Sequence, residues 1–302
     1  MNVAILGSGF GLYGYLPALL AQRCRVLLPE RYRAIVEGRA ELSGLAAEIS
    51  WLADEKEAID LADGLVIARR PADQTDMLAE ILHRPRLKRL LLEKPLAPNP
   101  ADAAKLQDQI EASGKIIRMG YTFDFTDWGQ NLIARAGASK GDMRIRWMFR
   151  AHHYAADRPT WKRFEPQGGG ALRFYGIQLI SLLAKLRFDT VLSSDVKSTH
   201  SGEVESWRAQ LLNNEGSHCD LEVDSNSEQT GFSVDAHSFA TSLPDPFAEQ
   251  PTGAQDRRVP VLSSLCREWL TSRQTPHLWY TRTIALWRAI EDATVRNDPA
   301  RP

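Results

Sequence analysis

The sequence predicts an α/β protein: a doubly wound parallel sheet at the N-terminus, followed by an α/β domain with a largely antiparallel, open sheet. Two observations support this prediction. Up to about residue 120, short apolar runs alternate with helical patterns, which is typical of buried parallel strands covered by helices on both faces. From about residue 141, strand-like segments alternate apolar and charged residues with period two, which indicates a sheet with one wet face. The expected domains are residues 1–120 and 121–302.

The first apolar run, residues 2–6, is followed by a glycine-rich turn and a helical pattern over residues 15–23. Strand, glycine turn and helix form the context that a dinucleotide-binding loop requires. Gly7 would allow the tight turn, and Gly9 the close approach of the backbone to a pyrophosphate. The third place of the usual spacing holds Leu12, so a glycine turn that binds nothing stays an alternative. The predicted cofactor contacts in this loop are Gly7, Gly9, Phe10 and Gly11.

The second strand is expected within residues 25–31. Glu30 lies about 20 residues beyond the glycine loop, where an acid accepts hydrogen bonds from the adenosine ribose of NAD. Arg31 and Arg33 would instead suit the 2′-phosphate of NADP, and all three also fit an ordinary solvated helix start. We take Glu30 and Arg31 as cofactor contacts and leave NAD and NADP open.

Two further apolar runs, residues 64–68 and 88–93, read as parallel strands with a helix over residues 76–83 between them. The second run ends in Glu93-Lys94-Pro95. Ligands gather at the carboxyl ends of strands in open α/β sheets, so Lys94 stands where chemistry is expected. Pro95 lacks an N–H and stops the strand; the alternative is a strand that ends in a solvated charge pair. The predicted cofactor contacts here are Arg69, Glu93 and Lys94.

The second half of the chain contains the segments with period two and two closing helices. The expected strands are residues 143–149, 204–212, 219–223 and 232–236. Residues 242–256 are expected to form a loop. The helices are expected over residues 260–272 and 280–296 and are assigned to the second domain. Their predicted core residues are Leu262, Leu265, Trp269, Trp287 and Ile290.

Composition excludes several classes of protein. Lys and Arg number 37 against 38 Asp and Glu, so no overall charge attracts nucleic acid or a membrane, and a small molecule is the expected partner. The three cysteines are scattered and no signal peptide is evident, which favours the cytoplasm. The histidines show no metal-ligand spacing, so no metal site is predicted.

Several motifs occur together: Gly7-Ser8-Gly9, Leu16-Pro17-Ala18-Leu19, Glu93-Lys94-Pro95, Gly120-Tyr121, and Gly168-Gly169-Gly170 before a helix that contains Gly176. In this combination the chain resembles the Gfo/Idh/MocA oxidoreductases, the superfamily of glucose-fructose oxidoreductase and inositol dehydrogenase, over nearly its whole length. The resemblance implies an N-terminal Rossmann domain that binds NAD or NADP, and a C-terminal α/β domain whose open sheet often mediates oligomerisation, so a homo-oligomer is expected.

The resemblance also implies that Lys94 lies beside the nicotinamide and the substrate hydroxyl or carbonyl. Typical members carry an Asp, a His and a second Asp on one face of the helix after the triple glycine. Here those places hold Phe174, Gln178 and Ser181, and none of them titrates near neutral pH. Gln178 can orient a substrate, but it cannot supply the acid or base that typically contributes 10²–10⁴-fold in rate.

A basic and aromatic segment, residues 152–163, precedes the triple glycine, and in the family this region often lines the substrate cleft. One of the adjacent histidines, of which we name His153, is therefore a candidate replacement for the missing acid or base. A solvated loop or a histidine pair at a strand edge is the alternative. The residues expected to contact substrate are Tyr121, Trp161, Tyr175 and Gln178. The cluster expected to favour an anionic substrate comprises Arg69, Arg70, Arg158, Lys162 and Arg163.

The sequence therefore predicts an NAD(P)-dependent oxidoreductase acting on a sugar-like or other small polar substrate, with an imine as a variant. The alternative is a catalytically degenerate relative that binds a dinucleotide or sugar as a sensor or partner protein. The missing helix acid and histidine favour the alternative, whereas the retained Lys94 favours the enzyme.

Overall fold

The computed structural model describes residues 1–302 except 137–140, 237–238, 244–252 and 298–302. The chain forms two compact units, and each is described by itself. The first unit comprises residues 1–96, 108–125 and 249–276, and the second comprises 97–107, 126–248 and 277–302. Each unit is thus assembled from three separate stretches, whereas the sequence predicts two continuous domains, 1–120 and 121–302.

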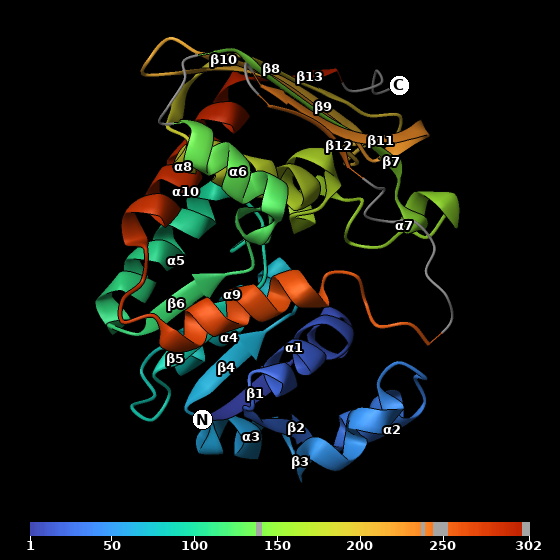
Figure 1. Ribbon diagram of the computed structural model, residues 1–302, viewed down its shortest axis with the longest axis vertical. Coiled ribbons are helices and arrows are strands. Elements are labelled where there is room, and N and C mark those ends of the chain that lie inside the picture. The colour runs from blue at the N-terminus through green and yellow to red at the C-terminus, as the bar shows by residue number, and fades with distance from the viewer. Residues whose placement is uncertain (137–140, 237–238, 244–252, 298–302) are drawn as a thin grey trace. The chain divides into compact units, whose positions relative to one another are not determined.

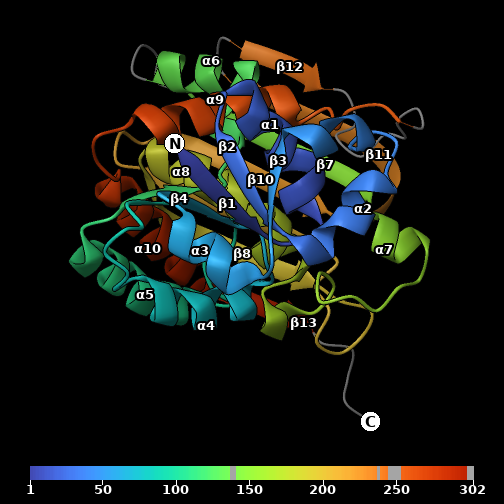
Figure 2. The ribbon, with the colours of Figure 1, turned by 90° about the horizontal axis from the view of Figure 1, so that it is seen from below.

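The first unit is built on a six-stranded sheet in the order β3-β2-β1-β4-β5-β6, with every pairing parallel. Its strands are β1 (Asn2–Leu6), β2 (Arg25–Pro29), β3 (Ile49–Leu52), β4 (Gly64–Ile67), β5 (Arg89–Leu92) and β6 (Ile116–Met119). This is the strand order of the Rossmann fold, so the predicted doubly wound parallel sheet is confirmed. Figure 2 shows β1 to β4 side by side.

The helices that belong wholly to this unit are α1 (Leu16–Ala21), α2 (Arg33–Glu37), α3 (Glu55–Leu61), α4 (Pro71–Ile81) and α9 (Val259–Thr271), and α5 (Pro100–Ser113) has residues in both units. A π-helical segment, Gly11–Tyr15, leads into α1, and short 3-10 turns cover Glu30–Tyr32, Ser43–Glu48 and Phe123–Phe125. Except for β3, the strands are buried along most of their length, as expected of a sheet covered on both faces.

The position of α9 corrects the prediction that it belongs to the second domain. Leu262, Leu265 and Trp269 are fully buried in the same apolar core as β1 and α1. The Arg89 guanidinium, at the start of β5, donates to the carbonyls of Trp269 and Ser272 at 2.7 and 2.8 Å. In Figure 1 the orange α9 runs alongside the parallel sheet next to α1. The apolar stripe of α9 was read correctly, but the stripe itself does not identify the surface against which it packs.

The second unit is built on a seven-stranded sheet in the order β12-β11-β7-β10-β9-β8-β13. Its strands are β7 (Met143–Arg150), β8 (Phe188–Lys197), β9 (Ser206–Asn213), β10 (His218–Asp224), β11 (Asn226–Ala236), β12 (Phe239–Leu243) and β13 (Thr294–Asn297). The β7–β10 and β8–β13 pairs are parallel and the other four are antiparallel, which confirms a largely antiparallel open sheet.

The helices that belong wholly to this unit are α6 (Asp127–Ala136), α7 (His152–Ala155), α8 (Ile177–Lys185) and α10 (His277–Ala293), with a π-helical segment at Ala171–Gly176 and a 3-10 turn at Glu165–Gln167. Helices α8 and α10 pack together, and Trp287 and Ile290 are buried as predicted. In the part of the chain that the structure describes, no helix combines the length and apolar character needed to cross a membrane.

Two predicted boundaries need correction. The helix expected over 280–296 ends at Ala293, because residues 294–297 pair with β8 as a parallel edge strand. The loop expected over 242–256 begins inside β12, because Ser242 pairs with Ser233 of β11. Residues 244–252 of that expected loop lie outside the described residues. In both cases pairing with another strand overrides the local pattern.

Candidate functional site

The glycine loop between β1 and α1 has the geometry that its sequence predicts. Gly7 has φ of +129°, and a Cβ placed on it would lie 2.2 Å from the carbonyl oxygen of Ala68, at the end of β4. Only glycine fits such a position. The Gly7 N–H donates to the Tyr32 hydroxyl at 3.1 Å, which connects the loop to the end of β2.

The next residues of the loop leave room for a ligand. Ser8 and Gly9 are exposed, and a Cβ on Gly9 would meet nothing within 4 Å. Among the described residues, no protein acceptor binds the N–H groups of Ser8 or Gly9, whereas the Gly9 carbonyl accepts from Leu12 and Tyr13 at 2.9 and 3.3 Å. Free N–H groups beside open space at the start of a helix fit a pyrophosphate, so the loop passes this test for a dinucleotide.

Phe10 is held by packing instead. Its ring lies edge-on to Tyr13 and Tyr15, with centroids 5.5 and 5.2 Å apart, and the Arg258 guanidinium lies 4.4 Å above it. Gly14 makes room for this ring, since a Cβ there would come within 2.6 Å of it. The imperfect glycine spacing is therefore compensated by an aromatic cluster. Nothing in the sequence connects Arg258 to this loop.

Charged side chains gather at the carboxyl ends of β2 and β4. Glu30 is about half exposed and pairs with Arg33, whose Nη2 donates to it at 3.0 Å. Arg31 and Arg69 both bind Oε1 of Glu55, at the start of α3, and the Tyr32 hydroxyl donates to the same atom at 3.2 Å. Glu55 was not predicted from the sequence, because β3, the strand before it, shows no long apolar run.

Glu93 is a partly buried carboxylate at the end of β5. It accepts a hydrogen bond from the Tyr15 hydroxyl and another from the Lys94 backbone N–H, at 3.3 Å. A Cβ on Gly120 would lie 2.6 Å from its Oε1, so the small residue after β6 is required there. Burial raises the pKa of Glu93, and the charge of Lys94 and the hydrogen bond from Tyr15 oppose that rise. Lys94 itself is half-buried.

Gln74, on α4, holds the same segment from a second direction. Its fully buried amide Nε2 donates to the carbonyls of Glu93 and Leu96, at 2.9 and 3.1 Å, on either side of Lys94. Buried amides without partners cost free energy, so these bonds restrict the backbone around the lysine.

In the second unit, the helix after the triple glycine differs from the expected geometry. Ala171–Gly176 is π-helical and α8 begins at Ile177, so the three places do not follow one α-helix and the predicted i, i+4, i+7 face is corrected. Gln178 and Ser181 are buried, and the Ser181 hydroxyl donates to the Gln178 carbonyl at 3.1 Å.

His153 is completely buried, and within the described residues neither ring nitrogen has a hydrogen-bond partner. Burial, followed by the charges of His152, Lys162 and Arg163, lowers the pKa of His153 to about 3. It is therefore neutral near pH 7, and its role as a replacement acid or base stays a prediction.

The remaining predicted substrate contacts are mostly enclosed as well. Tyr121 and Tyr175 are each 3% exposed, and burial raises the pKa of Tyr175 well above its usual value. Trp161 packs edge-on against Phe174, with centroids 5.1 Å apart, and the Lys162 ammonium lies 5.4 Å from the centre of the same ring. These contacts define an aromatic corner in the second unit.

Two of the five cations expected to favour an anionic substrate are already neutralised. Arg69 binds Glu55, and Arg163 binds the buried Glu203 at 2.9 Å and Asp157 at 3.0 Å. Arg70 and Arg158 are exposed. The anionic preference therefore depends on fewer residues than the sequence indicates.

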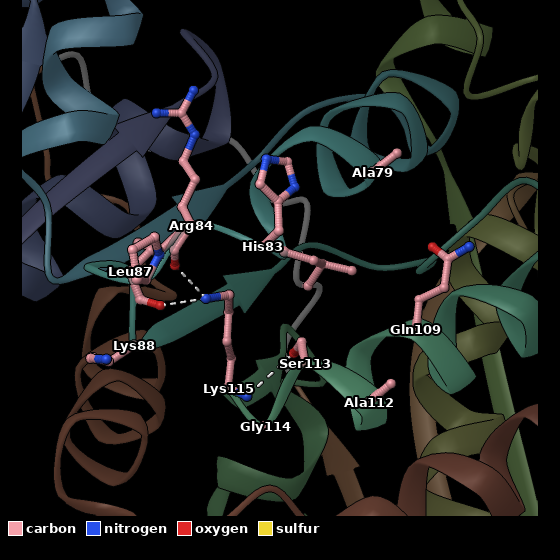
Figure 3. A pocket seen from close by; sticks show the side chains of 12 residues that line it. Ala79, His83, Arg84, Leu87, Lys88, Gln109, Ala112, Ser113, Gly114 and Lys115 are labelled. Atoms are coloured by element: carbon pink, nitrogen blue, oxygen red, sulfur yellow. Dashed lines mark hydrogen bonds between the residues drawn. The ribbon is translucent and has the colours of Figure 1, made fainter.

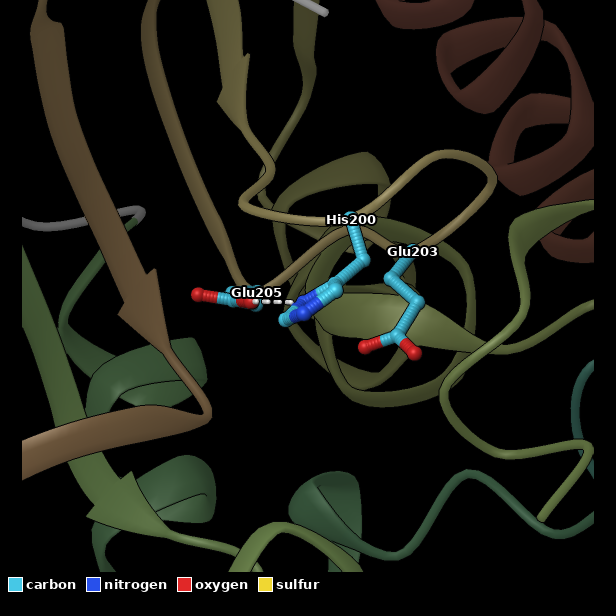
Figure 4. A group of neighbouring side chains, drawn as sticks. All are labelled: His200, Glu203 and Glu205. Atoms are coloured by element: carbon cyan, nitrogen blue, oxygen red, sulfur yellow. Dashed lines mark ion pairs between the residues drawn. The ribbon is translucent and has the colours of Figure 1, made fainter. Parts of the chain in front are cut away.

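Two other features of the structure are not assigned as functional sites. His200, Glu203 and Glu205 have ligand atoms within 4.8 Å of one another (Figure 4), but Arg163 and Thr199 already donate to the two carboxylates, and we assign no metal there. A pocket of about 690 Å³ opens at the amino ends of β5 and β6 (Figure 3), where the Lys115 ammonium donates to the carbonyls of Arg84 and Leu87, at 2.7 Å each. It lies at the edge of the sheet opposite the glycine loop.

No protein-family model and no curated protein matches the chain. Solved structures nevertheless share its fold. myo-Inositol 2-dehydrogenase from Lactobacillus plantarum superposes with a TM-score of 0.73 at 14% identity, over 97% of this chain and 96% of its own. The WlbA (WbpB) dehydrogenase from Thermus thermophilus, solved with NAD and UDP-GlcNAcA, gives 0.71 at 16% identity, over 99% and 97%.

KijD10, a 3-ketoreductase from Actinomadura kijaniata solved with NADP and TDP-benzene, gives a TM-score of 0.71 at 12% identity, over 98% of each chain. These neighbours are NAD(P)-dependent dehydrogenases of the Gfo/Idh/MocA type. The fold that the sequence resemblance implies is thus confirmed. At such low identity the likeness concerns the fold alone, and the chemistry has to be argued from this chain's own residues.

Proposed function

We propose that this protein is an NAD(P)-dependent oxidoreductase that transfers a hydride to or from a sugar-like or other small polar substrate. The observation that carries the proposal lies within the first unit. An open glycine loop at the end of β1 and a rigidly held lysine at the end of β5 flank β4 at the same edge of one parallel sheet. Ligands bind at that edge in this class of fold.

Different residues of the chain would bind the cofactor and move the proton. The N–H groups of Ser8 and Gly9 would hold the pyrophosphate, and Gly7 allows the turn that aims them. A bound nicotinamide supplies or accepts the hydride. Lys94 would hold or move the accompanying proton at the substrate oxygen or nitrogen, and the bonds from Gln74 keep its backbone in place. Glu93, whose carboxylate binds Tyr15, serves as its positioning residue.

The substrate class remains part of the proposal. An imine suits this site as a variant, because reduction of a protonated imine needs less help from an acid, and His153 is not protonated near neutral pH. Exposed Arg70 and Arg158 support an anionic substrate. Two neighbours were solved with nucleotide-linked compounds, so a nucleotide-linked sugar is a sensible first candidate. Gln178 and Trp161 are the proposed substrate contacts of the second unit.

Dinucleotide binding is tested with a glycine pair. Gly9→Glu places a carboxylate where the pyrophosphate would lie, and the open space around Gly9 means that the fold tolerates it. Gly44→Glu is the matched control, because Gly44 is also exposed with no atom within 4 Å of its Cβ position. Fluorescence titration with NADH and NADPH should show loss of binding for Gly9→Glu only. Equal binding by both variants, or none by the unmodified protein, would contradict the proposal.

A second candidate function is a non-catalytic protein that binds a dinucleotide or sugar ligand. It is favoured by the absence of a titrating group at Phe174, Gln178 and Ser181. Lys94→Ala separates the two functions. An enzyme loses turnover of a substrate panel while it still binds the dinucleotide, whereas binding without turnover in both forms identifies the second function.

A further inference from the structure

Glu55 occupies an unusual place for a carboxylate in a dinucleotide-binding unit. It begins α3, and its neighbours lead directly to the glycine loop: Glu55 accepts from the Tyr32 hydroxyl at 3.2 Å, and that hydroxyl accepts from the Gly7 N–H at 3.1 Å. Arg31, one residue after Glu30 at the end of β2, binds the same carboxylate. The adenosine ribose is expected at this strand end, so Glu55 borders its site.

Two of the guanidinium groups at these strand ends, those of Arg31 and Arg69, are engaged by Glu55. Arg31 and Arg69 bind one of its oxygens from different elements, and the Glu55 side chain is only 21% exposed. Burial raises the pKa of Glu55, but the hydrogen bond and charge of Arg69, together with the charge of Arg31, hold that pKa below its usual value. The carboxylate is thus charged at neutral pH and remains paired.

The third cation of this strand end is engaged as well. Arg33 is paired with Glu30 and also lies 3.6 Å from Glu37. Three arginines therefore face three carboxylates, and the strand end has no excess positive charge for a phosphate dianion. A ribose with a free 2′-hydroxyl, in contrast, needs only acceptors, and Glu30 and Glu55 provide them.

We propose that Glu55 is a specificity-determining residue that sequesters Arg31 and Arg69 and thereby selects NAD(H) over NADP(H). The inference rests on the proposed function, because it concerns the same dinucleotide. Neutralising Glu55 frees two arginines from different elements, which can then converge on a 2′-phosphate. The unmodified protein accordingly binds NADH more tightly than NADPH.

The test measures dissociation constants for NADH and NADPH by fluorescence titration at constant ionic strength. Glu55→Gln should tighten NADPH binding by about 10-fold or more while NADH changes by about 3-fold or less, since charge-assisted bonds to phosphate form only with NADPH. Glu48→Gln is the control, because it removes the same charge from an exposed site in the same unit. The double variant Glu55→Gln, Arg69→Ala should lose most of the gain.

Each outcome decides between the two claims. NADPH preference in the unmodified protein, or no gain in Glu55→Gln, overturns the role of Glu55 but leaves the proposed oxidoreductase intact. An equal gain in Glu48→Gln shows that total charge, not the sequestered pair, sets the preference, and it also overturns the role. Failure of every form to bind either dinucleotide overturns both the inference and the proposed function.

Discussion

Each unit contains a helix that follows a glycine-rich turn, and the two turns differ in how their N–H groups are used. Both run from a glycine turn through a π-helical stretch, Gly11–Tyr15 or Ala171–Gly176, into an α-helix. Both stretches contain a Tyr-Gly pair whose glycine makes room for an aromatic ring: a Cβ would lie 2.6 Å from Phe10 at Gly14, and 2.7 Å from Trp207 at Gly176. The packing of the two helices is therefore solved in the same way.

The turns themselves differ. At the first turn, Gly9 faces open space. At the second, the N–H groups of Gly168, Gly169 and Gly170 donate to carbonyls of residues 162–165, and a Cβ on Gly169 would lie 2.3 Å from the Trp161 carbonyl oxygen. In the first turn the N–H groups of Ser8 and Gly9 bind no acceptor among the described residues, whereas in the second all three glycine N–H groups bind carbonyls of the protein. A glycine motif alone does not distinguish the two roles.

The largest expected effect tests the closed turn. Gly169→Ala forces a Cβ against the backbone of Trp161 and Lys162, which cannot move away without breaking the turn. We expect a loss of about 2–4 kcal/mol in the free energy of unfolding, measured by urea denaturation. A loss below about 0.5 kcal/mol would mean that the second turn is as open as the first.

The next effect is a pH dependence of stability that comes from His153 in the second unit. Its ring stacks on that of Tyr175, with the ring centroids 6.3 Å apart. The folded pKa of about 3 lies below the ordinary value of 6.5, so the unfolded chain binds the proton first as the pH falls. Stability is therefore complete above pH 6.5 and is lost toward pH 3, by roughly 1 kcal/mol per pH unit. Unfolding of the unmodified protein and His153→Phe from pH 7 to 5 checks this, and parallel curves would contradict it.

A smaller effect on stability is expected for Tyr15→Phe, in the segment that leads into α1. Tyr15→Phe removes the hydroxyl that donates to the partly buried Glu93. We expect a loss of about 1–2 kcal/mol in the free energy of unfolding, because the carboxylate is left with one hydrogen-bond partner fewer. Tyr13→Phe is the matched control, since it removes a hydroxyl from a neighbouring ring that lies edge-on to Phe10 and 5.8 Å from the Arg258 guanidinium. Equal losses in both variants would show that ring packing, not the bond to Glu93, is responsible.

The smallest effect on stability is expected for Gly9→Ala. A methyl group there meets no atom, so the free energy of unfolding should change by about 0.5 kcal/mol or less. Dinucleotide affinity should still fall several-fold, because the methyl group occupies the approach to the loop. Calorimetry with and without NADH measures both quantities, and a stability loss like that of Gly169→Ala would remove the contrast between the turns.

Much of the fold was predictable, because buried parallel strands such as β1, β4 and β5 are continuous apolar runs, and β7 alternates along its length. The strands β3, β8, β12 and β13 were not predicted. Three of them are segments of only four or five residues, and β8 shows no regular alternation of buried and exposed side chains.

The site was predictable where one residue type is required by backbone geometry, as at Gly7. The partners of those residues were not. Tyr15 with Glu93, Arg258 over Phe10, and Glu55 with its two arginines are all contacts between distant stretches that leave no local pattern. The burial of His153 could not be predicted either, because the sequence gives the chemistry of a side chain but not its surroundings.

The path of α9 has a consequence for synthesis on the ribosome. The first unit is started by residues 1–96, yet its apolar core includes Val259, Leu262 and Trp269. During translation, the face of α1 (Leu16–Ala21) that packs against α9 stays uncovered until α9, which begins at Val259, has been synthesised. The apolar core of the first unit is therefore incomplete for most of translation. We expect this protein to depend most on chaperones during that time.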